Sequence, residues 1–130
     1  MLDQNIINNW QVEHFIAYLY LAIADADNET TDDEVAMATR KTKRLFKDYH
    51  SESTIDHEAL IGEVMQEIKN HKEVERTDLI NEWNKKFHLT EDEKTDIISD
   101  LTDIIASDDH VQASEHYMLS FIRLVLAKNA

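Results

Sequence analysis

Two short segments of this 130-residue chain concentrate carboxylate side chains in a pattern typical of a cation site. The first segment covers residues 26–34 and the second covers residues 107–115. Each follows a long apolar run and places an Asp seven residues before a Glu, with Asp27 and Glu34 in the first and Asp108 and Glu115 in the second. A hard cation such as Ca²⁺ takes about six to eight oxygen ligands, which carboxylates and turn carbonyls can supply. The spacing therefore predicts two acidic turns able to bind a divalent cation.

The candidate metal ligands are the carboxylates of these two turns: Asp25, Asp27, Glu29, Glu34, Asp108, Asp109 and Glu115. The first turn is not an EF-hand, because Thr30 stands where Gly is required and Ala36 where the bidentate Glu should be. A structural interpretation stays open beside the metal hypothesis. Glu34 follows Thr31 at the spacing of a capping box, and an Asp after a helix often bonds its own turn. No cofactor other than such a cation is indicated.

The sequence does not indicate an enzyme. Di-iron bundle enzymes need Glu-x-x-His on a core face, and none of the seven histidines has a Glu three residues before it. The chain also has no cysteine, no Gly-x-Ser-x-Gly nucleophile elbow and no glycine-rich phosphate loop. We therefore predict a binding function and keep a carboxylate-bridged metal enzyme only as a remote alternative.

Composition predicts an all-α protein. The chain has no proline, a single glycine at Gly62, and 42% apolar residues, so it lacks the turn residues that hairpins use. A chain of 130 residues is long enough to form one hydrophobic core. We expect residues 1–130 to form a single helical domain, since no flexible linker divides them.

The charge balance narrows the choice of partners. A formal net charge of −14 repels phosphate backbones and anionic lipids, so we expect neither nucleic acid binding nor membrane insertion. The longest apolar run, residues 15–24, is about half of a membrane span. The N-terminal residues lack a basic signal-peptide region, and we expect a cytoplasmic protein with an unidentified protein partner. The basic cluster at residues 40–47 suits either a helix C-terminus or a partner-binding patch.

Apolar spacing and capping signals predict six helices, and a bundle of about six to seven in all. The first is apolar nearly all round and should be central, whereas the fifth should turn Asp92, Asp96, Asp100 and Asp103 to solvent. Capping boxes at Thr31 and Thr90 mark two of the starts. The expected ranges are 9–25, 31–49, 56–70, a helix starting between 73 and 77 and reaching 87, 90–105, and 113–128.

The acidic turns belong to a longer internal similarity. An offset of 81 residues aligns the two turns, and it also aligns Ile23 with Ile104 and Met37 with Met118. The helix pairs near residues 9–49 and 90–128 therefore look like related units. We expect the two pairs to pack about a pseudo-twofold axis.

The first acidic turn resembles the signature of TerB-like domains, the tellurite-resistance group whose fold also occurs in the helical domain of the DjlA co-chaperone. Leu21-Ala22-Ile23-Ala24-Asp25-Ala26-Asp27-Asn28-Glu29, running on to Thr31 and Glu34, is similar to that family's apolar helix followed by Ala-Asp-Gly-Glu, a capping residue and a Glu. The second turn is similar too. Asn28 and Asp109 replace the usual Gly, Thr30 replaces an aliphatic residue, and His110 and Gln112 depart from the pattern in the second turn.

The resemblance implies a compact helical bundle without enzymatic activity. It further implies a role in bacterial stress responses, often beside membrane-associated partners, and divalent cation binding by the acidic turn. A protein-interaction adaptor with no bound ion is the alternative within the same class of binding proteins.

Overall fold

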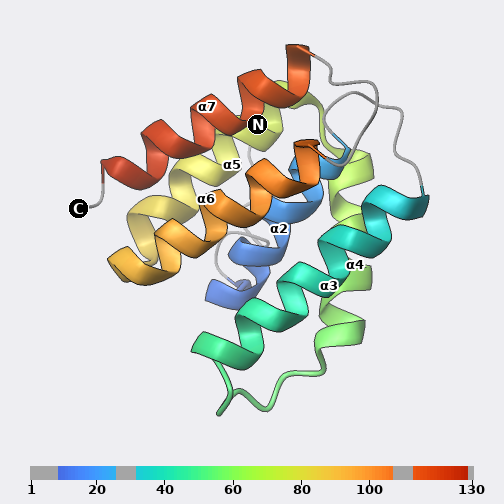
Figure 1. The fold of residues 1–130 in the computed structure, drawn as a ribbon, viewed down its shortest axis with the longest axis vertical. Helices are drawn as coiled ribbons and strands as arrows, with labels where there is room; N and C mark the ends of the chain where they lie inside the picture. Colours follow the sequence, from blue (N-terminus) through green and yellow to red (C-terminus); the bar gives the residue numbers. More distant parts are fainter. Residues whose placement is uncertain (1–8, 26–31, 107–112, 129–130) are drawn as a thin grey trace.

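The computed structural model describes residues 9–25, 32–106 and 113–128, and within them the chain forms six α-helices and no strand (Figure 1). The all-α prediction is thus confirmed. The helices are α2 (Val12–Ala24), α3 (Asp32–Tyr49), α4 (His57–Asn70), α5 (Glu73–Lys86), α6 (Glu91–Ala106) and α7 (Ala113–Ala127).

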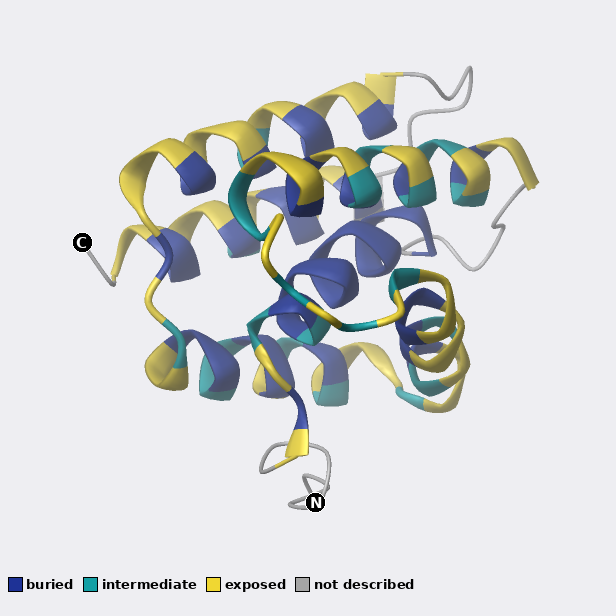
Figure 2. Cartoon of the chain, turned by 90° about the horizontal axis from the view of Figure 1, so that it is seen from below, coloured by how far each residue is buried: buried dark blue, intermediate teal, exposed yellow. Residues whose placement is uncertain are grey.

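Helix α2 lies at the centre, as its sequence predicts. Every residue from Phe15 to Ala24 is fully buried, and α2 contacts each of the other five helices of the described chain. Figure 2 shows it as a dark blue helix enclosed by helices that each keep an exposed side. An α-helix can bury all of its faces when its own side chains are apolar all round, which is the pattern of residues 15–24.

The start of α2 differs from the prediction, because the helix begins at Val12 and not at Asn9. Gln11 is extended, and its backbone N–H donates to Nδ1 of His14 at 3.1 Å. Trp10 therefore precedes the helix, yet its indole stacks on His14 and on Trp83, each at a centroid distance of 5.1 Å. The side chain of Trp10 belongs to the core, as its apolar character predicts, although the residue itself precedes α2.

The starts of α4 and α6 follow local signals in the sequence. Asp56 caps α4 by accepting hydrogen bonds from the backbone N–H groups of Glu58 and Ala59. The hydroxyl of Thr90 accepts from the N–H of Glu93 at the start of α6 at 3.1 Å. Such caps satisfy amide groups that have no partner within the helix. The capping residue expected for α3, Thr31, lies outside the described residues.

The two helix pairs that the internal similarity predicts are both present. Helix α2 packs on α3 and α6 packs on α7, while α3 also contacts α6 and α2 contacts α7. The pairs differ in burial, since α2 is enclosed and α6 keeps an exposed face. The pseudo-twofold relation between them stays a prediction.

One of the four acids expected on the exposed face of α6 is instead buried. Asp92, Asp96 and Asp103 are exposed as predicted, whereas only 3% of Asp100 is accessible, so the prediction for Asp100 is wrong. Asp100 lies three residues after Ile97 and four before Ile104, which places it on the core stripe of the helix.

Asp100 links three helices through its two oxygens. The Tyr20 hydroxyl of α2 donates to Oδ2 at 2.6 Å, and Nη2 of Arg44 in α3 donates to Oδ1 at 2.6 Å. Lys41 lies 3.6 Å from the same Oδ1. Burial raises the pKa of Tyr20 far above its ordinary value, and the bond to Asp100 adds to the effect. Lys43 pairs with Glu58 as well. Three residues of the basic cluster of α3, namely Lys41, Lys43 and Arg44, therefore pair with carboxylates of the same chain.

Candidate functional site at the acidic helix ends

Three of the predicted metal ligands lie among the described residues, and all three are buried. Asp25 follows the last residue of α2, Glu34 lies in the first turn of α3, and Glu115 lies in the first turn of α7. Their exposed fractions are 8%, 5% and 0%. The other four predicted ligands, Asp27, Glu29, Asp108 and Asp109, lie outside the described residues. The acidic turns are therefore bordered by carboxylates that point into the protein.

The carboxylate of Asp25 forms an ion pair with a buried arginine. Nη2 of Arg76 in α5 lies 2.8 Å from Oδ2 of Asp25, and Nη1 donates to the Asp25 carbonyl at 3.4 Å. The same guanidinium donates to the carbonyls of Ile68 at 2.8 Å and His71 at 3.1 Å. Arg76 thus joins the end of α2 to the connection between α4 and α5, and it balances the charge of Asp25.

A second contact ties the same connection to α2. The Tyr18 hydroxyl and Nδ1 of His71 are 3.0 Å apart. Burial raises the pKa of Tyr18, while the charge of Arg76 opposes that rise. Tyr18 therefore stays protonated and can donate this hydrogen bond to the imidazole. Together the two contacts hold the C-terminal half of α2 in a fixed position before the first acidic turn.

Glu34 and Glu115 occupy the same place in their helices. Each lies in a first turn, where the helix dipole and the free backbone amides stabilise a negative charge by about 0.3–1 kcal/mol. Asp32 and Asp33 share the first turn of α3 but are exposed. Within the described residues no three His, Asp or Glu side chains lie close enough together to hold a metal ion. A site completed by the turns would therefore need ligands from residues 26–31 or 107–112.

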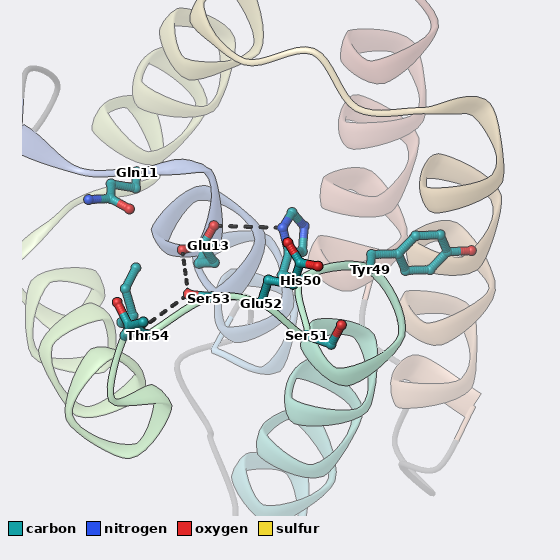
Figure 3. A pocket seen from close by; sticks show the side chains of 9 residues that line it. Gln11, Glu13, Tyr49, His50, Ser51, Glu52, Ser53 and Thr54 are labelled. Carbon is teal, nitrogen blue, oxygen red and sulfur yellow. Dashed lines mark hydrogen bonds and ion pairs between the residues drawn. The ribbon is translucent and has the colours of Figure 1, made fainter.

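A separate polar pocket lies where the connection after α3 passes the start of α2 (Figure 3). Its volume is about 680 Å³. Figure 3 shows the side chains of Glu13, His50 and Ser53 turned toward one another, with Tyr49 pointing away. The lining residues are Gln11, Glu13, Tyr49, His50, Ser51, Glu52, Ser53, Thr54 and Ile55.

His50 lies between two buried carboxylates at this pocket. Its Nε2 is 2.7 Å from Oε2 of Glu93 in α6, and its Nδ1 is 3.7 Å from Oε1 of Glu13 in α2. Ser53 donates to the other oxygen of Glu13 at 3.3 Å. The serine hydroxyl is directed at a carboxylate and not at the imidazole, so this pair does not form the serine–histidine contact that activates a nucleophile. The cluster connects α2, α3 and α6.

Sequence reasoning missed Arg76, Glu13, His50 and Glu93 as members of buried polar clusters. For Arg76 a signal exists, because Arg76, Leu79, Ile80 and Trp83 follow helical spacing and share the core-facing side of α5. A cation on that side needs a buried anion. For the other three residues the chain offers no local signal, since His50 and Glu93 are 43 positions apart.

The described residues define the class of protein: an all-helical domain with a central apolar helix, in which acidic stretches of sequence follow α2 and α6. The family model for tellurite resistance protein TerB matches residues 13–127, so the chain belongs to the TerB family. No curated protein and no solved structure matches the chain. Among the described residues, no helix is both long enough and apolar enough to cross a membrane.

Proposed function

We propose that this chain is a non-enzymatic, tellurite-resistance-type binding domain whose acidic interhelical turns bind a divalent cation such as Ca²⁺. The observation that carries the proposal is the burial of Glu34 and Glu115 at matching positions of the two sequence copies. Membership of the TerB family supports a domain of tellurite-resistance type. We place the protein in the bacterial cytoplasm, where it would act in a stress response.

Carboxylates that border an acidic segment favour a hard cation, because Ca²⁺ takes about six to eight oxygen ligands and the acidic segment supplies further carboxylates. In the first turn we assign Asp27, Glu29 and Glu34 as ligands. Asp25 belongs to the predicted set as well, but its carboxylate would be shared between the ion and Arg76. In the second turn we assign Asp108, Asp109 and Glu115.

A thermal melt of the metal-free protein with and without Ca²⁺ tests the proposal. An ion present at 100 times its dissociation constant stabilises the folded state by about 2.7 kcal/mol. For a domain of this size that corresponds to a rise in Tm of roughly 8–14 °C. We expect Asp27→Asn to abolish the rise, and a chelator to reverse it. Metal analysis of the purified protein gives an independent measurement of the bound ion.

Asp33→Asn is the matched control, because it removes the same charge from an exposed residue close to the same turn. It should leave the Ca²⁺ response intact. If both variants reduce the response equally, Ca²⁺ only screens the net charge of −14 and the proposed site is wrong. NaCl at matched ionic strength measures that screening directly.

The alternative is an adaptor that docks a partner protein through its charged faces and holds no ion. The exposed side chains of Arg40 and Lys47 on α3 favour it, because the neighbouring Lys41, Lys43 and Arg44 already pair within the protein. A Tm that is indifferent to Ca²⁺ and to chelator would favour the adaptor. A remote alternative, a carboxylate-bridged metal enzyme, predicts iron in the purified protein and an absorption band in the visible range.

A further inference from the structure

Helix α7 exposes a stripe of large apolar side chains. Tyr117 and Leu124 are 75% and 66% exposed, and Phe121 between them is only partly buried. These residues are spaced four and three positions apart, so they lie along one side of the helix. An adjoining side of α7 carries Met118, Ile122 and Val125 in the core. The helix is therefore apolar on two sides, of which the rest of the described bundle covers one.

Helix α7 lies along an outer edge of the bundle in Figure 1. A shallow hollow of about 640 Å³ runs along it. We use the name α7 outer face for the residues that line this hollow: His116, Tyr117, Ser120, Phe121 and Leu124. An apolar stripe of this kind on a surface is typical of a contact with another macromolecule.

The α7 outer face carries no exposed carboxylate, although the chain has a net charge of −14. The one acid in α7 is Glu115, which is fully buried. Arg123 and Lys128 are the exposed charged residues at this end of the chain. Two copies of so acidic a protein repel each other wherever their carboxylates meet. On the α7 outer face that repulsion is absent, and apolar side chains are available for burial.

We propose that two copies of this chain associate through the α7 outer face, with the two α7 helices antiparallel about a twofold axis near Ser120. A twofold contact uses the same patch on both copies, so the patch must be complementary to itself. Tyr, Phe, Leu and Ser side chains meet that condition because they bring no like charges together. Ser120 is near the middle of the stripe from Tyr117 to Leu124.

The antiparallel arrangement follows from the charges at the start of the helix. The second acidic segment, residues 107–115, leads directly into α7. Parallel helices would bring these segments of the two copies together, whereas antiparallel helices place them at opposite ends, about 22 Å apart. Antiparallel packing also brings the opposite ends of the two helix dipoles together.

The contact is smaller than a standard interface, which buries roughly 800 Å² on each partner. One helix face offers less than that, so we expect a weak dimer with a dissociation constant of roughly 10–300 µM. Salt should strengthen it, because ions screen the repulsion between the two acidic molecules. A contact held by opposite charges would instead weaken with salt.

Sedimentation equilibrium of the full chain tests the proposal at about 5–500 µM protein in 50 and 500 mM NaCl. We expect the double variant Tyr117→Ser/Leu124→Ser to raise the dissociation constant at least 10-fold. The matched control is Val74→Ser, which removes an equally exposed apolar side chain from α5 and should change nothing. Circular dichroism confirms that each variant is folded.

A cysteine variant tests the position of the axis. Because the chain has no cysteine, Ser120→Cys introduces the only thiol. Oxidation with copper phenanthroline should then couple two thiols into an intermolecular disulfide and yield a covalent dimer. Ser51→Cys, at an exposed position in the connection after α3, should remain monomeric under the same conditions.

Three results would overturn the proposal. The first is a wild-type protein that stays monomeric at 500 µM in 500 mM NaCl, and the second is a dimer that the serine substitutions leave intact. The third is a monomer whose α7 outer face binds anionic vesicles in a flotation assay. The last result would assign the face to a lipid surface. None of these results affects the Ca²⁺ melt, so the cation proposal is tested separately.

Discussion

Replacing Asp100 by alanine should destabilise the protein strongly, although this residue belongs to a row of acids that reads as a solvated helix face. The carboxylate is 3% exposed and accepts hydrogen bonds from Tyr20 and Arg44. Its loss leaves the buried hydroxyl of Tyr20 without its acceptor, which costs about 1–3 kcal/mol. The side chain of Arg44 is 60% exposed and can be hydrated, so that bond adds no more than about 1 kcal/mol.

The expected loss for Asp100→Ala is therefore about 1–4 kcal/mol in the free energy of unfolding. Urea denaturation followed by circular dichroism measures it directly, and Tm should fall by roughly 3–20 °C. Asp103→Ala is the matched control. Its carboxylate lies on the same helix and pairs with Lys41, but 57% of its side chain is exposed, so the loss should stay below about 1 kcal/mol.

A second substitution, Tyr20→Phe, measures the contribution of the Tyr20 hydroxyl separately from that of the Asp100 carboxylate. Tyr20→Phe alone should cost about 0.5–1.5 kcal/mol, the net value of one hydrogen bond. Added to Asp100→Ala, it should cost nothing or recover stability, since it removes the hydroxyl that had lost its partner. The reasoning fails if the two losses simply add, or if Asp100→Ala and Asp103→Ala are equally stable.

Substitutions at three further sites test other parts of the structure by urea denaturation. Arg76→Met should lose about 3–5 kcal/mol because it removes the guanidinium that forms a buried ion pair with Asp25 and donates to the carbonyls of Ile68 and His71. Asp25→Asn should restore part of the loss, and an unchanged midpoint would contradict the ion pair. Burial lowers the pKa of His14 below its ordinary 6.5, and the nearby Glu63 opposes that shift. Because the unfolded chain then binds more protons at His14 than the folded protein does, the free energy of unfolding should fall as the pH drops below 6.5. His14→Gln should make that fall shallower between pH 7.5 and 5, and parallel curves would show that His14 does not contribute. Gly62→Ala should stabilise the protein by about 0.5–1 kcal/mol, because Gly62 lies inside α4 and an added Cβ meets no atom within 4 Å. A loss of stability would contradict the open space beside Gly62.

The sequence was sufficient to predict the helices because their signals are local. The periodic apolar residues of α2, α4 and α6 and the caps at Asp56 and Thr90 each involve residues within one or two helical turns. The unbroken apolar character of residues 15–24 was likewise enough to predict that α2 lies at the centre. The family signature in the first acidic turn is also local, and it predicted the family that the comparison then showed.

The sequence predicted the residues of the candidate cation site but not their contacts or burial. The chain itself shows that an acidic segment follows each of two apolar runs, but it does not show that Asp25 forms an ion pair with Arg76, which is 51 positions away. The burial of Glu34 and Glu115 was likewise not predicted, since both read equally well as exposed residues of a helix start.

Composition, helical period and capping residues therefore determined the fold class, the approximate ranges of the helices and the positions of the acidic segments in the sequence of this protein. Tertiary structure alone decided which polar groups lie in the interior: Tyr20 meets Asp100 from 80 positions away, and His50 bridges Glu13 and Glu93. The physical reason is that helix formation depends on neighbours along the chain. The protonation, pairing and burial of a polar side chain depend on the groups that packing brings against it.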